Sequence, residues 1–145
     1  MRKAVILAAA LVAVFSRPVS AEAGDPNDIL IIVNASLKER SISESDLRDI
    51  FLKKRTAWKS GVKAVPIHSR NAELRGDFLG RLLNMSASEE ARYWQEQQIR
   101  SGGSAPTAFG NTLEAVYRLK GAVSYVYRSD YREGVVKVVL TLPAP

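Results

Sequence analysis

The stretch Ile29-Leu30-Ile31-Ile32-Val33 decides the fold of this chain, because it is an unbroken run of apolar and mainly β-branched residues. A strand with one face in water alternates apolar and polar residues, whereas a strand covered on both faces is apolar throughout. We therefore expect a buried central strand at residues 29–33. A helix is predicted next, over residues 43–52, where Ser43 precedes an acidic first turn and apolar residues recur at helical spacing.

Outward from this strand, strands and helices alternate along the rest of the chain. Glycine and proline make residues 101–106 a loop between two of these elements. The remaining predicted elements are strands at 62–68, 122–127 and 135–140, helices at 73–83 and 86–100, and a short helix that ends at Gly121. This pattern predicts an α/β domain with three layers (α/β/α) around a mostly parallel, mixed sheet.

The first residues are typical of a secretory signal peptide. Arg2 and Lys3 precede an apolar stretch of residues 4–15, and small residues surround positions 21 and 23. The stretch is shorter than the roughly 20 residues that a membrane-spanning helix needs, so we expect it to be removed after residue 21 or 23 and to leave no membrane span. Residues 22–28 would then form a linker and residues 29–145 a single domain in the periplasm.

Composition excludes several classes of function. Cleavage after residue 21 removes three cations and lowers the formal charge from +6 to +3, without the dense basic stripe of a nucleic-acid-binding protein. The chain has no cysteine, which excludes disulfides and thiolate metal sites. It also lacks a nucleophile elbow, a phosphate loop and a recognisable metal-ligand spacing. We therefore expect a binding protein with no enzymatic activity, no metal and no cofactor.

Two strand ends are the candidate binding sites, because ligands of open α/β sheets lie at the carboxyl ends of strands. One follows residue 33, and the other precedes the helix at 73–83, where backbone N–H groups favour an anion. Guanidinium groups match the oxygens of phosphate or carboxylate two at a time. We expect the two strands to be neighbours in a parallel sheet, which brings the two ends to within one strand spacing of each other. The predicted anion-binding residues are Ser69, Arg70, Asn71, Asn34, Ser36 and Arg75.

Some of these residues also have a simpler interpretation. Arg70 and Arg75 could be solvated surface charges, with Arg75 paired to Glu73 or Asp77. His68 is the only histidine, and at the end of a strand it is expected to be structural rather than a ligand or a base.

Five short segments keep a characteristic order and spacing: residues 29–34, residues 47–52 with Trp58 and Gly61, residues 65–70, Phe78, and residues 121–126. Together they resemble the periplasmic phosphate ABC transporter substrate-binding proteins over nearly the whole chain after the signal peptide. The resemblance implies the fold of one lobe of a type II periplasmic binding protein, with Arg70 at the position of the family's anion-binding arginine. The chain departs from the family at Glu73-Leu74-Arg75, where the family has Ser-Gly-Thr, and at Ser124, which replaces a glycine.

Two functions follow from this resemblance. The first is a solute-binding-like protein that holds phosphate or a similar small oxyanion weakly, because a complete member of the family closes two lobes around its ligand and this chain has room for one. The second is an envelope interaction module that keeps the fold without the anion site and contacts a partner protein or a second copy of itself. Arg70 favours the first function, and Glu73 favours the second.

Overall fold

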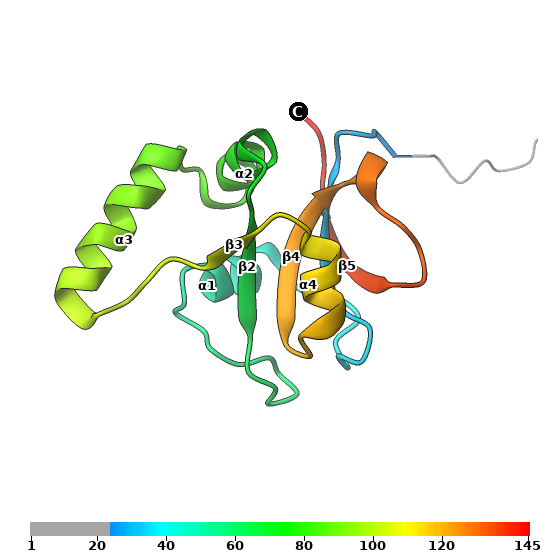
Figure 1. Cartoon of the computed structure of the whole chain (residues 1–145), viewed down its shortest axis with the longest axis horizontal. Helices are drawn as coiled ribbons and strands as arrows, with labels where there is room; N and C mark the ends of the chain where they lie inside the picture. Colours follow the sequence, from blue (N-terminus) through cyan, green and yellow to red (C-terminus); the bar gives the residue numbers. More distant parts are fainter. Residues whose placement is uncertain (1–23) are drawn as a thin grey trace, which may run out of the picture.

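A computed structural model describes residues 24–145 of the chain, and the predicted signal peptide lies outside the described residues. Five strands form one sheet in the order β3-β2-β4-β1-β5 (Figure 1). In chain order the elements are β1 (Ile29–Asn34), α1 (Glu44–Phe51), β2 (Val65–Ser69), α2 (Ala72–Phe78), a π-helical turn η1 (Leu79–Leu83), α3 (Ala87–Ser101), β3 (Thr107–Phe109), α4 (Thr112–Arg118), β4 (Ala122–Tyr127), a 3-10 turn η2 (Arg128–Asp130) and β5 (Val136–Leu142).

The sheet is mixed, and β1 is the strand that runs against the others. It pairs antiparallel with both β4 and β5, whereas β2 pairs parallel with β3 and β4. Four strands therefore share one direction, which confirms the predicted mixed, mostly parallel α/β class. The expectation that β1 and β2 are parallel neighbours is wrong, because β4 lies between them and β1 points the opposite way.

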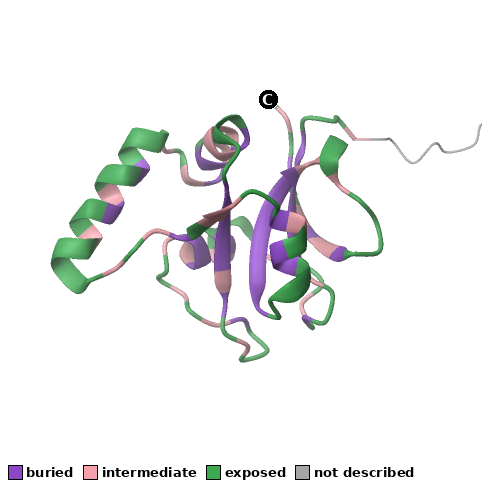
Figure 2. Cartoon of the chain, in the orientation of Figure 1, coloured by how far each residue is buried: buried purple, intermediate pink, exposed green. Residues whose placement is uncertain are grey.

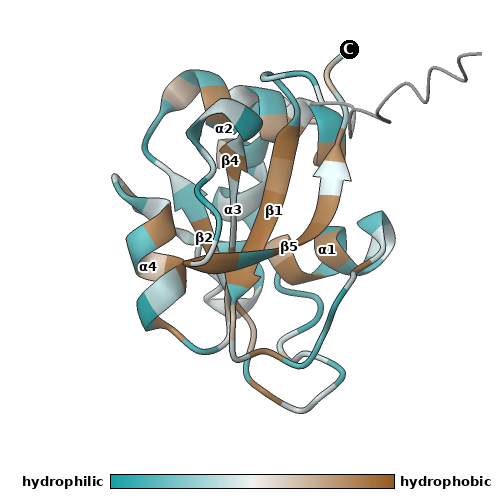
Figure 3. Cartoon of the chain, turned by 90° about the vertical axis from the view of Figure 1, so that its right-hand side faces the viewer, coloured by the Kyte–Doolittle hydropathy of each residue, from teal (hydrophilic) through white to brown (hydrophobic). Residues whose placement is uncertain are grey.

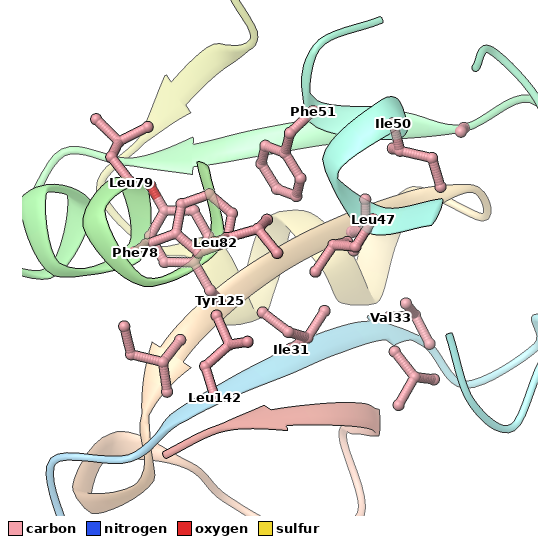
Figure 4. Packing of buried hydrophobic residues seen from close by; sticks show 14 of the residues in the cluster. Ile31, Val33, Leu47, Ile50, Phe51, Phe78, Leu79, Leu82, Tyr125 and Leu142 are labelled. Carbon is pink, nitrogen blue, oxygen red and sulfur yellow. The ribbon is translucent and has the colours of Figure 1, made fainter. Parts of the chain in front are cut away.

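The core explains why the 29–33 run has no polar face. Ile29, Ile31 and Val33 pack on one side of the sheet against α1, α2 and η1, and the two residues between them pack on the other side near α4. All five are at most 2% exposed, as expected for a strand covered twice. Figure 4 shows Ile31 and Val33 under Leu47 and the other residues of the first side, and Figure 2 shows the burial concentrated on the inner strands.

Local sequence signals place most of the helices. The Ser43 side chain accepts a hydrogen bond from the Asp46 N–H and caps α1, which confirms the predicted start of this helix. The helix expected at 73–83 is present as α2 followed by η1. Strand β3 was not predicted; its three residues pair with β2 at the sheet edge. In Figure 3, apolar colour runs along β1 and β4, whereas the helices carry both apolar and hydrophilic colour.

Helix α3 stands apart from the other helices, beside the edge of the sheet (Figure 1). It has 15 residues, and only Glu90 and Trp94 are buried. Near its end, Ile99 is 87% exposed. Among residues 24–145, no helix is both long enough and apolar enough to cross a membrane.

Candidate functional site

The turn after β2 is built by short-range hydrogen bonds. The Asn71 side chain accepts from the Leu74 N–H at 3.1 Å and caps α2, and the Ser69 hydroxyl accepts from the Asn71 N–H at 3.0 Å. The Arg70 N–H continues the pairing of β2 with β3 by donating to the Phe109 carbonyl. The side chains of Ser69 and Asn71 therefore hold the turn in shape, and the Arg70 side chain is exposed beyond it.

A shallow pocket of about 370 Å³ opens beside this turn. Ser69 and Asn71 form one wall, and the start of α4 forms another, where Asn111 caps the helix by accepting from the Glu114 N–H. The N-termini of α2 and α4, each with a partial positive charge, thus meet at this pocket. No ion pair within residues 24–145 involves the Arg70 guanidinium, so its charge is free to attract an anion.

One carboxylate opposes an anion in this pocket, and it is not the one that the sequence suggested. Glu73 is exposed and does not line the pocket, whereas Asp130 does. Asp130 comes from η2, 60 residues further along the chain, so no local pattern around Arg70 reveals it. The Asp130 carboxylate repels a bound anion and lowers its affinity for the pocket. Water weakens this repulsion, because the pocket is open to solvent.

Asn34 and Ser36 do not belong to this site, which corrects the sequence-based expectation. Because β1 is antiparallel to β4, the carboxyl end of β1 lies beside the start of β4, at the opposite end of the strands from Ser69. There the Asn34 amide donates to two backbone carbonyls at the end of α4 and accepts from the Ser36 hydroxyl. Asn34 therefore connects β1 to α4, and Ser36 holds the Asn34 side chain in place.

Arg75 also faces away from the pocket. Its guanidinium lies 2.5 Å from a Glu90 oxygen on α3, so it pairs with neither Glu73 nor Asp77. Of the six predicted residues, the structure keeps Ser69, Arg70 and Asn71 together and places the other three elsewhere.

His68 is fully buried at the centre of a polar cluster that its sequence neighbours do not reveal. Its Nδ1 lies 2.8 Å from the Tyr125 hydroxyl oxygen, and its Nε2 lies 2.9 Å from Glu90 Oε2. The Nε2 contact is electrostatic, because the ring N–H is not aligned with the oxygen as in a hydrogen bond. Glu90 lies in a stripe of residues 87, 90, 91 and 94, whose helical spacing was the available signal that a carboxylate faces inward.

The ionisation of this cluster follows from its neighbours. Burial raises the pKa of the Tyr125 hydroxyl above its usual range, so the phenol keeps its proton. Burial alone would also raise the pKa of Glu90, but the contacts with His68 and Arg75 outweigh it and hold that pKa below its usual value. Glu90 is therefore an ionised carboxylate that is almost fully buried.

The side chains of β4 fill the space where β2 and β4 separate. The two strands are in register only at Val65 and Pro66. Beyond that point the Ser124 hydroxyl donates to the Ile67 carbonyl at 2.8 Å, and the Tyr125 hydroxyl accepts from the Ser69 N–H at 3.2 Å. Ser124, which replaces a glycine of the resembled family, thus satisfies a carbonyl of β2.

Comparisons with known proteins identify the fold. No protein-family model and no curated protein matches the chain. Among solved structures, it is similar to a putative phosphate ABC transporter substrate-binding protein with bound phosphate from Clostridium perfringens, with a TM-score of 0.58 and 18% identity over 79% of this chain and 46% of that chain. An ABC-type phosphate transport receptor from Vibrio cholerae gives 0.59 and 15% over 79% and 47%, and PstS from Borrelia burgdorferi gives 0.57 and 15% over 79% and 50%.

These similarities confirm the fold that the resemblance implied. The chain has the fold of a substrate-binding protein and spans about half the length of the structures it matches. Identities of 15–18% establish the fold alone, so the ligand of this chain is a separate question.

Proposed function

We propose that this protein is a periplasmic, solute-binding-like protein that binds phosphate or a similar small oxyanion weakly at the turn Ser69-Arg70-Asn71. The observation that carries the proposal is the meeting of two capped helix starts at one pocket. Arg70 does not line the pocket itself, but it lies between Ser69 and Asn71, which do, and it is exposed and has no ion pair among the described residues. Backbone N–H groups and a guanidinium are the groups that oxyanion sites use. The similar protein from Clostridium perfringens has phosphate bound, and the one from Vibrio cholerae is a phosphate transport receptor, which supports this ligand class.

Two features make the proposed binding weak. The pocket is open to solvent, whereas tight small-ligand sites enclose about 70–90% of the ligand surface. Asp130 also adds a negative charge to the pocket wall. We therefore expect binding that weakens with added salt, because exposed charges are screened.

Calorimetric titration of the protein lacking the predicted signal peptide, with phosphate and with sulfate, tests this proposal. Arg70→Gln should weaken binding by about tenfold or more, the loss expected for a hydrogen bond to a charged group. Asp130→Asn should strengthen it. Arg92→Gln on α3 is the matched control, because Arg92 is an exposed arginine on a helix that does not line the pocket. Equal affinities of wild type, Arg70→Gln and Arg92→Gln would refute binding at this turn.

One observation favours a second candidate function, a protein-interaction module of the envelope. A groove of about 640 Å³ lies between α4 and the β4–β5 connection, and it shares Asn111 and Asp130 with the pocket. Its apolar residues include Tyr117, which is 61% exposed, and Val135, which is 37% exposed. Exposed apolar residues around a groove are common at protein contacts.

The two functions make different predictions in the same experiments. An interaction module should show no heat with either anion, in wild type or in Asp130→Asn. Its self-association, measured by sedimentation, should depend on protein concentration and be lost in Tyr117→Asp. A monomer that binds phosphate supports the first function.

A further inference from the structure

Another pocket, of about 280 Å³, lies at the start of β2, whereas the turn of the proposed oxyanion site follows its end. It forms where the α1–β2 connection, the first residues of β2 and the residues before β3 meet. The α1–β2 connection is the long loop below β2 in Figure 1. Val65 and Pro66 line this pocket, and Ser69 lines the other one, so the two pockets are distinct and share no lining residue.

The buried residues that line this pocket form an apolar floor. Ile50 of α1 is 1% exposed and Ala64 is 7% exposed, and both Pro66 and Pro106 are buried. A proline has no backbone N–H, so two of these residues offer no hydrogen-bond donor to water. Such a floor favours contact with an apolar group over contact with water.

The more exposed lining residues form a basic rim, and we call the whole the basic pocket. The rim residues are Lys53, Arg55, Thr56, Lys63 and Thr107, and no carboxylate lines the pocket. The Arg55 guanidinium lies 3.2 Å from Asp46, which compensates one positive charge. No ion pair within residues 24–145 involves Lys53 or Lys63. The rim therefore keeps a net positive charge, with two threonine hydroxyls beside it.

The charge of the rim belongs to a longer basic segment. Residues 50–72 contain no aspartate or glutamate, and the cations of the α1–β2 connection are Lys53, Lys54, Arg55, Lys59 and Lys63. The whole chain has a formal charge of +6, so its positive charge is concentrated around this pocket. Charge of one sign that is gathered at a hollow raises the local concentration of anions.

Lys53 has a backbone conformation that lysine rarely adopts. It follows Leu52, the residue that caps the end of α1, and its φ is 56°. Glycine is favoured at this position because it reaches a positive φ without a Cβ clash. The Lys53 ammonium lies next to α3, 5.8 Å from the centroid of the Trp94 ring. A side chain held on such a backbone points to a use for its charge.

We propose that the basic pocket binds a small organic anion, whose apolar body lies on the floor and whose phosphate or carboxylate group contacts Lys53 and Lys63 at the rim. The pocket volume corresponds to about nine water-sized groups of about 30 Å³ each. One ring or a short chain fits this volume, whereas the acyl chain of a lipid is too long. The site goes beyond the proposed function, because an inorganic oxyanion would leave the floor uncovered.

Three probes separate the contributions of the apolar body and the charge. Phenyl phosphate has both, phenol has the ring without the charge, and inorganic phosphate has the charge without the ring. In nuclear magnetic resonance titrations of the protein lacking the predicted signal peptide, phenyl phosphate should shift the amide signals of Ala64 and Thr107. It should saturate these shifts at a concentration about tenfold or more below that of the other two probes, because only phenyl phosphate uses both floor and rim.

Either of two results would overturn the proposal. Phenol that shifts these amides as strongly as phenyl phosphate would show an apolar hollow without charge recognition. Inorganic phosphate that shifts them as strongly would show a basic surface without an apolar site.

A charge variant tests the rim directly. The Lys63 side chain is exposed, so Lys63→Gln should fold normally and weaken phenyl phosphate binding by about threefold to tenfold. Lys38→Gln is the matched control, because Lys38 is an exposed lysine that does not line the pocket. Equal affinities of wild type, Lys63→Gln and Lys38→Gln would refute recognition at this rim.

Lys53→Gly distinguishes a binding role of Lys53 from a structural one. Glycine suits the positive φ, so this variant should keep or raise the midpoint of urea unfolding and yet weaken phenyl phosphate binding. Weaker binding together with a lower urea midpoint would assign Lys53 to the packing of Trp94 and contradict its place at the rim.

The same titrations separate this site from the proposed oxyanion site. Phosphate at the turn should shift the amides of Asn71 and Leu74, which lie in that pocket, and should depend on Arg70. Phenyl phosphate should still shift the amides of Ala64 and Thr107 in Arg70→Gln. A silent turn with a responsive basic pocket therefore refutes the proposed function alone, and the reverse result refutes this inference alone.

Discussion

Replacing Gly121 by alanine should destabilise the protein by about 3 kcal/mol or more, because two backbone segments touch at this residue. A Cβ on Gly121 would lie 1.8 Å from the Lys63 carbonyl oxygen, whereas real Cβ atoms stay beyond about 3.0 Å. The segments would have to separate by about 1.2 Å. The sequence suggested that Gly121 is needed to end a helix, but its φ is not positive, and the close approach is the actual requirement.

The magnitude follows from the hydrogen bonds that this separation would stretch. The Gly121 carbonyl accepts from the Val65 N–H at 2.9 Å and from the Trp58 indole N–H at 2.9 Å. Trp58 is 4% exposed, so water cannot replace its lost partner. A buried donor or acceptor left without a partner costs about 1–3 kcal/mol.

Urea unfolding followed by tryptophan fluorescence measures this cost. Gly80→Ala is the matched control, because a Cβ there meets nothing within 4 Å and its φ is not positive. Alanine at Gly80 should leave stability unchanged or raise it by up to about 1 kcal/mol. A loss of less than about 1 kcal/mol in Gly121→Ala would show that the Lys63 segment moves freely, and the reasoning from close approach would be refuted.

Three further outcomes follow from other contacts. Ile31→Asp places a charge on a strand that is hydrogen-bonded on both sides, so it should cost several kcal/mol and remove the native circular dichroism spectrum of the soluble protein. Asn34→Ala should lower the free energy of unfolding by about 1–3 kcal/mol in urea, through two lost hydrogen bonds, and leave phosphate affinity unchanged in calorimetry. The Ala144 N–H donates a hydrogen bond to the Asp28 carboxylate and lowers its pKa the most, and Arg128 lowers it further. Desolvation of the carboxylate raises the pKa but does not cancel these effects. Asp28→Asn should therefore destabilise the protein above about pH 4 and lose its effect in acid as the wild-type carboxylate is protonated, which thermal melts across pH can measure.

The sequence pattern predicted which strand is buried, but it did not predict in which direction that strand runs relative to its neighbours. The run at 29–33 predicted a strand covered on both faces, and Ser43 predicted the start of α1, because each signal is local. A strand covered on both faces is equally apolar whether its neighbours are parallel or antiparallel. The direction of β1 was therefore not encoded in its own residues, and the placement of Asn34 near Ser69 failed for that reason.

The candidate site was predictable to the extent that it is local. Ser69, Arg70 and Asn71 are consecutive, so any turn after β2 keeps them together. Asp130 and Glu90 are distant in the chain and reach their partners through tertiary packing. Strand β3 has only three residues, too few for an apolar–polar alternation to be recognised. It forms by pairing with the free side of β2.

The pairing of β1 with the last strands also determines the order in which the chain can fold. Residues of β1 contact β4 and β5, about 100 positions later, so the middle of the sheet closes only when nearly the whole chain is available. Contacts of such high sequence separation carry a large loop-closure entropy and slow folding. Chains truncated before β4 should remain unfolded however well α1 and α2 form. The regions of Ala144 and Asp28 are hydrogen-bonded to each other, so a circularly permuted chain that joins them should fold faster than the natural chain.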